Sequence, residues 1–351
     1  MISEESILMV DTDGTYVCSA NDPEPPKTRP QFPEAYPISA TPWQTGTVLL
    51  SGNAGFTEID RRGEVVGHLP AEHLDWPIEG TNAIGGVRQT TGSDRWICFS
   101  ARAFDPTPSD EPPVATLRTR QPDGSLVTGS LYKSSEACSA VYLLDRRSLE
   151  LSMLMPGMPF GTFEASKERF IWLEHESSTS CKLRIEPLGG NASSISFKTH
   201  LHHVCRISVD PSGTRALLSG GVRSRRPVVL VDLEGCTATN LPTRGGGAVW
   251  CSTTQFLFYA VEARLVLFDL LVESGEIVFT NPQWTPPGGR FIEDLGSWTA
   301  QPRVSPSGTW ATWSCTDRDE EGALQGARTA VINLRTGSNR IIPHKRLAVP
   351  F

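Results

Sequence analysis

A tight turn followed by a short apolar segment recurs along this chain, and it limits the folds open to the chain more than any other feature. One copy, S-V-D-P-S-G-T-R-A-L-L-S, occupies residues 208–219. Similar copies begin at Val10 (V-D-T-D-G-T-Y-V-C-S-A) and Val304 (V-S-P-S-G-T-W-A-T-W-S-C). Gly and Pro or Asp in the turn, with β-branched or aromatic residues after it, are typical of a β-hairpin. A single hairpin of this size is not stable, so the copies must pack together.

Four further copies have the apolar strand but a turn of different sequence, which brings the number of copies to seven. They lie at residues 45–52, 93–101, 167–174 and 253–260. Most copies are followed by a second hairpin signal, consisting of a short strand, a polar turn and another apolar-rich strand. These second signals begin at Phe56, Val141, Val228, Leu265 and Ala330. No segment keeps a long 3.6-residue period, so we expect little helix.

Two hairpins per unit, repeated about every 40 to 55 residues, indicate four-stranded blades. A blade alone leaves both faces uncovered, whereas blades packed around an axis bury them. The chain resembles the β-propeller superfamily, specifically the loose WD40-like and TolB-like (PD40-type) repeats with a Pro-Ser-Gly turn. We therefore expect an all-β, seven-bladed β-propeller that forms a single domain over residues 1–351. The alternative is a six-bladed ring with an added N-terminal strand, because the Pro-rich segment after Ala20 is unsuited to central strands.

The overall charge and the N-terminal residues limit the partners that we expect. The net charge of −7 and the pI of about 5.6 argue against a nucleic acid or an anionic membrane as partner. No apolar run is long enough to span a membrane. The apolar run at residues 7–10 is too short for a signal peptide and has no basic segment before it, which predicts a cytoplasmic protein.

The eight cysteines are spread singly, and three of them lie inside apolar runs, namely Cys18, Cys98 and Cys315. Buried cysteines of this kind behave as small apolar residues. We expect reduced cysteines, with disulfides as the alternative.

Two long loops are candidates for the site, because propellers of this type bind ligands at the axis, between loops of one face. Residues 104–137 contain a turn signal around Pro122-Asp123-Gly124 and are predicted to form a hairpin lid over the axial face. The loop at 281–301 carries Trp284 and Trp298, which we predict to be walls for an apolar or ring-shaped substrate. Trp76, in the loop at 70–82, is a further candidate for substrate binding. The alternative is that the side chains of Trp284 and Trp298 plug the ring or pack beneath their loop.

Three histidines precede the strand of the opening stretch, in H-L-H-H-V-C-R-I-S-V-D. On a strand, His200 and His202 share one side and His203 takes the other. We predict His202 and His203 to be catalytic acid–base groups, with a polar rim as the alternative. His175, on the predicted 174–180 loop of the adjacent blade, could meet them and is a candidate for substrate binding.

A resemblance to the oligogalacturonate lyases bears on whether this site holds a metal. Those lyases are propellers that use a histidine cluster and a glutamine on a metal ion. The resemblance makes Gln301 a candidate substrate-binding residue, but Arg303 stands where another histidine would be expected. We therefore predict no cofactor, with a divalent metal on His200 and His202 as the alternative.

A short basic segment, G-G-V-R-S-R-R-P, supplies the remaining candidates. The planar guanidinium group suits carboxylates and enolates. We predict Arg223 to be a catalytic hydrogen-bond donor and Arg225 to bind substrate. The alternative is a solvated loop.

Together these features predict an enzyme that acts on a small organic substrate at the propeller axis. With no nucleophile motif in the chain, a lyase or cyclase fits best, a pericyclic cyclase included, for a specialised metabolite or an acidic saccharide. Such a site works by shaping the substrate and by hydrogen bonding to a carbonyl or oxyanion. The alternative is an intracellular protein-interaction scaffold with a protein partner, which would present a broad exposed face.

Overall fold

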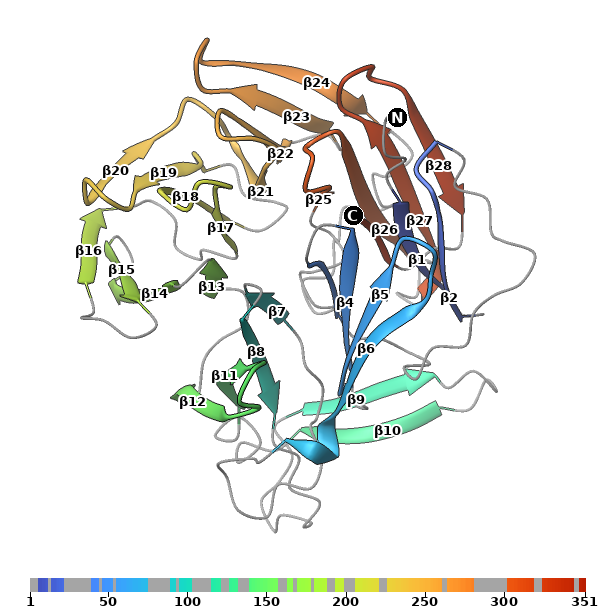
Figure 1. Ribbon diagram of the computed structural model, residues 1–351. Helices are drawn as coiled ribbons and strands as arrows, with labels where there is room; N and C mark the ends of the chain where they lie inside the picture. The colour runs from blue at the N-terminus through green and yellow to red at the C-terminus, as the bar shows by residue number, and fades with distance from the viewer. Residues whose placement is uncertain are drawn as a thin grey trace.

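The chain folds into a ring of small antiparallel β-sheets arranged around a common centre (Figure 1). Among the residues described, helix is limited to one short 3-10 turn at Ala71–His73. The computed structural model describes residues 6–11, 14–21, 39–43, 46–52, 55–74, 89–92, 95–102, 115–120, 126–131, 139–156, 163–166, 169–177, 180–187, 193–198, 206–220, 226–260, 264–280, 302–318, 324–343 and 347–351.

The sheets are seven blades, six with four strands and one with three, plus a separate hairpin. From the centre outward, the strands of blades 1 to 4 are β29 (Leu347–Pro350), β1 (Ser6–Asp11) and β2 (Gly14–Ser19); β3 (Ser39–Pro42), β4 (Thr47–Gly52), β5 (Gly55–Asp60) and β6 (Val65–Pro70); β7 (Gln89–Gly92), β8 (Trp96–Arg102), β11 (Ser139–Asp145) and β12 (Leu151–Pro156); and β13 (Phe163–Ser166), β14 (Arg169–Ser177), β15 (Ser180–Pro187) and β16 (Ser193–Lys198). Those of blades 5 to 7 are β17 (Arg206–Val209), β18 (Arg215–Ser219), β19 (Val229–Asp232) and β20 (Thr237–Asn240); β21 (Gly245–Trp250), β22 (Gln255–Ala260), β23 (Arg264–Asp269) and β24 (Ser274–Thr280); and β25 (Arg303–Val304), β26 (Trp310–Arg318), β27 (Leu324–Asn333) and β28 (Asn339–Pro343).

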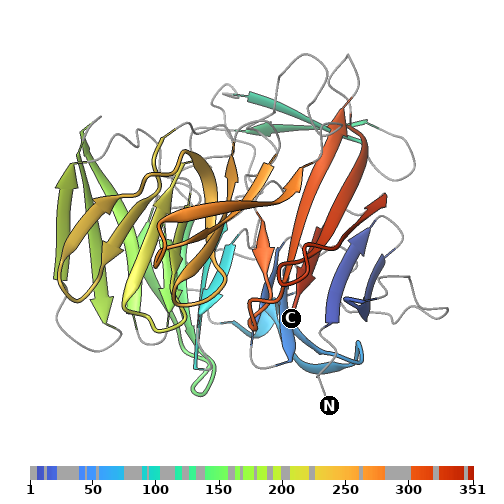
Figure 2. The ribbon, with the colours of Figure 1, turned by 90° about the horizontal axis from the view of Figure 1, so that it is seen from above.

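The first strands of the seven blades contact one another in a closed cycle. The order is β29, β3, β7, β13, β17, β21, β25 and back to β29. The predicted seven-bladed β-propeller is therefore confirmed, and the six-bladed alternative is wrong. Figure 2, turned by 90° from Figure 1, shows the blades standing side by side around the ring.

Blade 1 is built from both ends of the described chain. Strand β29 pairs with β1, and the register joins Ile7 to Pro350 and Val10 to Leu347. Strand β29 takes the innermost place, so β1 and β2 are the second and third strands, and no fourth strand is described in this blade.

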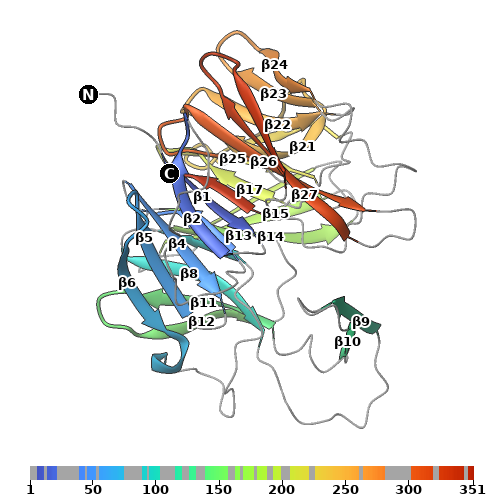
Figure 3. The ribbon, with the colours of Figure 1, turned by 90° about the vertical axis from the view of Figure 1, so that its right-hand side faces the viewer.

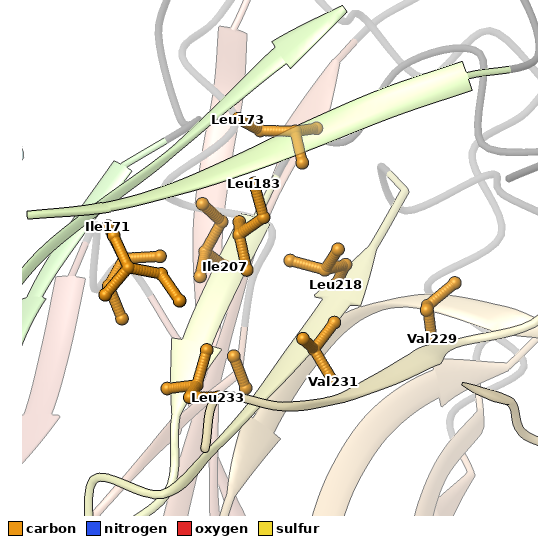
Figure 4. Packing of buried hydrophobic residues seen from close by; sticks show 10 residues of the cluster. Ile171, Leu173, Leu183, Ile207, Leu218, Val229, Val231 and Leu233 are labelled. Atoms are coloured by element: carbon orange, nitrogen blue, oxygen red, sulfur yellow. The ribbon is translucent and has the colours of Figure 1, made fainter. Parts of the chain in front are cut away.

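The core of the protein is divided among the blade interfaces. Seven clusters of buried apolar residues are described, and each lies between two neighbouring blades. Figure 4 shows the cluster between blades 4 and 5, where Ile171, Leu173 and Leu183 meet Ile207 and Leu218. The hydrophobic effect therefore holds each blade against its two neighbours.

The second strand of each blade is apolar on both sides because alternate residues pack into different interfaces. In β18, Leu217 faces blade 6 while Leu218 faces blade 4. In β8, Cys98 faces blade 4 while Phe99 faces blade 2. The repeated apolar runs in the sequence follow directly from this double burial.

The turn within residues 208–219 is stabilised by the side chain of its first residue, Asp210. Asp210 Oδ1 accepts hydrogen bonds from the backbone N–H groups of Thr214 and Arg215, each at 2.9 Å, and Gly213 has a φ of 75°. In blade 7 Ser305 takes the same place, and its Oγ accepts from Trp310 N at 3.1 Å. The sequence repeat thus corresponds to one recurring capped turn.

A second recurring turn closes the outer hairpin of five blades. The last residue of the third strand accepts hydrogen bonds from backbone N–H groups two to four residues later, which is the geometry of an Asx turn. These residues are Asp60, Asp145, Asp232, Asp269 and Asn333. These hairpins were predicted from the sequence, but the role of the residue at each strand end was not.

The predicted hairpin in the 104–137 loop is present. Strands β9 (Ala115–Arg120) and β10 (Leu126–Leu131) pair with each other in a sheet of their own. In the sequence they lie between β8 and β11, the second and third strands of blade 3. Figure 3 shows this hairpin standing apart from the blades. That it covers the axis as a lid stays a prediction.

The described cysteine side chains agree with reduced cysteines. Cys18, Cys98, Cys236 and Cys251 form no disulfide. Burial raises the pKa of the Cys98 thiol well above its ordinary value and that of Cys251 to about 12, so both are protonated and unreactive at neutral pH. In the part of the chain that the structure describes, no helix is both long and apolar enough to cross a membrane.

Candidate functional site

Three charged side chains on first strands point to the centre of the ring as the candidate site. They are Glu164 in β13, Arg206 in β17 and Arg303 in β25. Each stands next to an apolar residue that packs between blades, for example Phe163 beside Glu164 and Ile207 beside Arg206. Because neighbouring residues on a strand face opposite ways, the charged side chains are turned away from those apolar contacts.

Two hydrogen bonds place both guanidinium groups on the inner side of the ring. Arg206 Nη1 donates to the carbonyl oxygen of Pro302 at 3.3 Å, although β21 lies between β17 and β25 in the cycle of first strands. Arg303 Nη1 donates to the carbonyl oxygen of Ala40 in β3, although β29 lies between those two strands. Each side chain therefore passes an intervening first strand on its way to a partner.

The Glu164 carboxyl lies where it interacts with blade 5. It accepts a hydrogen bond from the backbone N–H of Val209 and is attracted to the guanidinium of Arg206. Burial outweighs both effects and raises the pKa of Glu164 to about 7. At neutral pH this carboxyl is therefore divided between its protonated and ionised forms, which suits a group that gives and takes protons.

The two arginines experience different charges. Burial lowers the pKa of Arg206, and the carboxylate of Glu164 opposes that change. Burial also lowers the pKa of Arg303, to about 9, and the positive charge of Arg206 lowers it further. None of the ion pairs found within the described residues includes Arg303. The site therefore has an excess of positive charge, which suits a developing oxyanion or a bound anion.

The raised pKa of Glu164 predicts how the stability of the protein depends on pH. The folded state binds this proton more tightly than the unfolded state, whose glutamate has an ordinary pKa of 4.5. The stabilising effect of the proton is complete below pH 4.5 and is lost as the pH rises through about 7. The change amounts to about 2 to 3 kcal/mol in the free energy of unfolding.

Urea unfolding at pH 5 and pH 8 measures this effect in wild type, Glu164→Gln and Glu234→Gln. From pH 5 to pH 8, the free energy of unfolding of Glu164→Gln should fall by about 2 to 3 kcal/mol less than that of wild type. Glu234 is exposed, so Glu234→Gln should follow wild type. Equal pH dependence in all three proteins would contradict the assignment.

Most residues predicted from the sequence lie outside the described residues. These are Trp76, His200, His202, His203, Arg223, Arg225, Trp284, Trp298 and Gln301. His175 is described only through its backbone, and it lies within β14 opposite Cys181 rather than in a loop. Among the described residues, no three His, Cys, Asp or Glu side chains are grouped as metal ligands. The histidines of the metal alternative are not among those residues.

Glu164 and Arg206 were not among the residues predicted from the sequence, and Arg303 stood out only as a departure from a histidine pattern. A signal is nevertheless present. Each is a charged residue within, or at the start of, a short first strand, in F-E-A-S, R-I-S-V and R-V-S. A charge in a strand whose neighbours are all buried is a candidate for the channel of a propeller.

Sequence comparison finds no family model and no curated protein that matches this chain. The matches are solved structures, and they are similar in fold alone. TolB from Acinetobacter baumannii is 12% identical with a TM-score of 0.35, over 61% of this chain and 63% of that chain. A putative TolB from Agrobacterium tumefaciens is 13% identical with a TM-score of 0.39, over 69% and 90%. The dihydro-heme d1 dehydrogenase NirN, in complex with DHE, is 15% identical with a TM-score of 0.46, over 99% and 74%. TolB propellers are thus among the structures that this loose-repeat propeller is similar to.

Proposed function

We propose that this protein is a small-molecule enzyme with its site at the propeller axis, a lyase or cyclase of a specialised metabolite or an acidic saccharide. One observation carries the proposal. Glu164, Arg206 and Arg303 come from three different blades, and both arginines reach across the inner side of the ring. Charged groups held by a rigid frame around one point are what acid–base and oxyanion chemistry requires.

In a lyase reaction, ionised Glu164 takes the proton from a carbon next to a carbonyl group. The electron pair of that C–H bond forms the new C=C bond, and the leaving group departs with its own bonding pair. Arg206 or Arg303 stabilises the negative charge that develops on the carbonyl oxygen. Protonated Glu164 can then return its proton to the leaving group.

In a cyclase reaction, the same groups act without a leaving group. Protonated Glu164 or a guanidinium donates a hydrogen bond to a carbonyl oxygen and so lowers the barrier to ring closure, a pericyclic one included. Within this proposal, His202, His203 and Arg223 are further catalytic groups, and Arg225, His175, Gln301, Trp76, Trp284 and Trp298 bind the substrate. We propose a cofactor-free reaction in the cytoplasm, with a metal on His200 and His202 as the alternative.

Native mass spectrometry and elemental analysis of protein purified without chelator should identify a bound small molecule and any metal. With that molecule or its precursor as substrate, Glu164→Gln should lower kcat by about 10² to 10⁴. The matched control Glu234→Gln should leave kcat unchanged. If Glu164→Gln keeps full kcat, or the purified protein converts no candidate, the proposal is wrong.

One observation favours the alternative, a protein-interaction scaffold. Leu271 and Val272 in the outer turn of blade 6 are 77% and 68% exposed, and Ile277 in β24 is 51% exposed. A scaffold that uses this surface should lose a co-purifying partner when Leu271 and Val272 are both replaced by Ser. Glu164→Gln should leave that partner bound.

A further inference from the structure

We infer that Arg206 and Arg303 bind the carboxylate of a small organic acid, which makes the substrate an anion. The inference rests on the proposed function and specifies its substrate class. It assigns the two guanidinium groups to binding, and Glu164 to the atoms that react beside the bound carboxylate.

The first argument is the balance of charge around Arg303. With Glu164 ionised, the three side chains sum to one positive charge, and with Glu164 protonated they sum to two. The charged neighbour that acts on Arg303 is Arg206, another cation. A half-buried cation next to a like charge is destabilising unless an anion accompanies it. A ligand anion between the two arginines would supply that charge.

The second argument is geometry. Arg206 donates to the carbonyl oxygen of Pro302, the residue directly before Arg303, so the guanidinium of Arg206 reaches the strand that carries the other arginine. Arg303 donates to Ala40 through Nη1 alone. A guanidinium has five N–H donors, so Arg303 retains donors for the two oxygens of a carboxylate.

The third argument is the link to Glu164. An anion beside Arg206 competes with ionised Glu164 for the same positive charge. Binding therefore favours protonated Glu164, and protonation of Glu164 favours binding by the same factor. We expect the anion to bind more tightly at pH 6 than at pH 8 and to raise the protonated fraction of Glu164 in the complex.

Thermal unfolding of the full chain tests the inference with sodium benzoate, inorganic phosphate and sodium chloride at matched ionic strength. Benzoate should raise Tm above the chloride value at pH 6, and the gain should be smaller at pH 8. Glu164→Gln should keep the gain but lose its pH dependence. A gain for phosphate without one for benzoate would overturn the carboxylate assignment, and equal Tm in benzoate and chloride would overturn the site.

Matched variants separate a binding role from a structural one. Arg303→Met should lose the benzoate gain, whereas Arg335→Met, at an exposed turn of the same blade, should keep it. Without probe, Arg303→Met should unfold at the same or a higher Tm than wild type, because it removes an uncompensated cation. Arg303→Lys keeps the charge but loses the paired N–H donors of the guanidinium, so the rise in Tm with benzoate should fall severalfold. An undiminished gain in Arg303→Lys or Arg303→Met would overturn the inference.

The two proposals fail separately. If substrate is converted in a reaction that needs Glu164, but no anion binds at Arg303, this inference alone is wrong. If benzoate binds at Arg303 but turnover does not depend on Glu164, the proposed function alone is wrong.

Discussion

Removal of Leu347–Phe351 should prevent the protein from folding into a stable ring. These residues supply β29, which pairs with β1 and contacts both β3 and β25. Val349 and Phe351 are 0% and 1% exposed and fill the core between blades 1 and 2. We expect a loss of more than about 5 kcal/mol, which is comparable to the whole stability of many domains. Urea unfolding followed by circular dichroism measures it.

Two single substitutions calibrate this result. Phe351→Ala keeps the strand and removes one buried ring, so it should cost about 3 to 5 kcal/mol. Leu271→Ala removes an apolar side chain of similar kind that is 77% exposed, and it should change stability by no more than about 0.5 kcal/mol. A truncated chain with the wild-type midpoint and slope would show that β29 does not close the ring.

Gly308→Ala, in the inner turn of blade 7, should lower the free energy of unfolding by about 3 kcal/mol or more. Gly308 has a φ of 70°, which an L side chain adopts only with strain. An added Cβ would also meet the carbonyl oxygen of Cys251 inside van der Waals contact. That oxygen belongs to the backbone of blade 6, so relief requires the two blades to move apart.

Gly337→Ala is the matched control. Gly337 has a φ of 71°, and an added Cβ would meet nothing within 4 Å. This variant should lose only the conformational contribution, about 1 to 2 kcal/mol. Equal midpoints in urea for the two variants would mean that the contact with Cys251 has no effect.

The blades were predictable because their signals are local. The turn around Gly213 and its equivalent at Gly308 occur within single hairpins, and so do the apolar runs that follow them. The role of β29 was not predictable in the same way, because its pairing with residues 7–10 joins segments at opposite ends of the sequence. The D-T-D-G turn after Val10 resembles the inner turns, although it joins the second and third strands of blade 1.

The site was less predictable than the fold for a related reason. Arg206 and Arg303 become neighbours through the curvature of the ring, which no local pattern encodes. Histidines and tryptophans are the more obvious candidates in a sequence because such residue types carry chemistry in many proteins, whereas a charge in a four-residue strand looks like an ordinary polar position. The burial that gives Glu164 a pKa of about 7 is a property of the assembled blades.

The hairpin in blade 3 has a consequence for how such a frame can change over time. Strands β8 and β11 pair in continuous register from Trp96–Asp145 to Arg102–Ser139, although β9 and β10 lie between them in the sequence. The entropy of closing a loop grows only with the logarithm of its length, so this insertion adds on the order of 2 kcal/mol relative to a tight turn. A chain of this design can lengthen, shorten or exchange that segment by recombination while the blades keep their pairing. The inserted segment and the stability of the blades can then evolve at nearly independent positions.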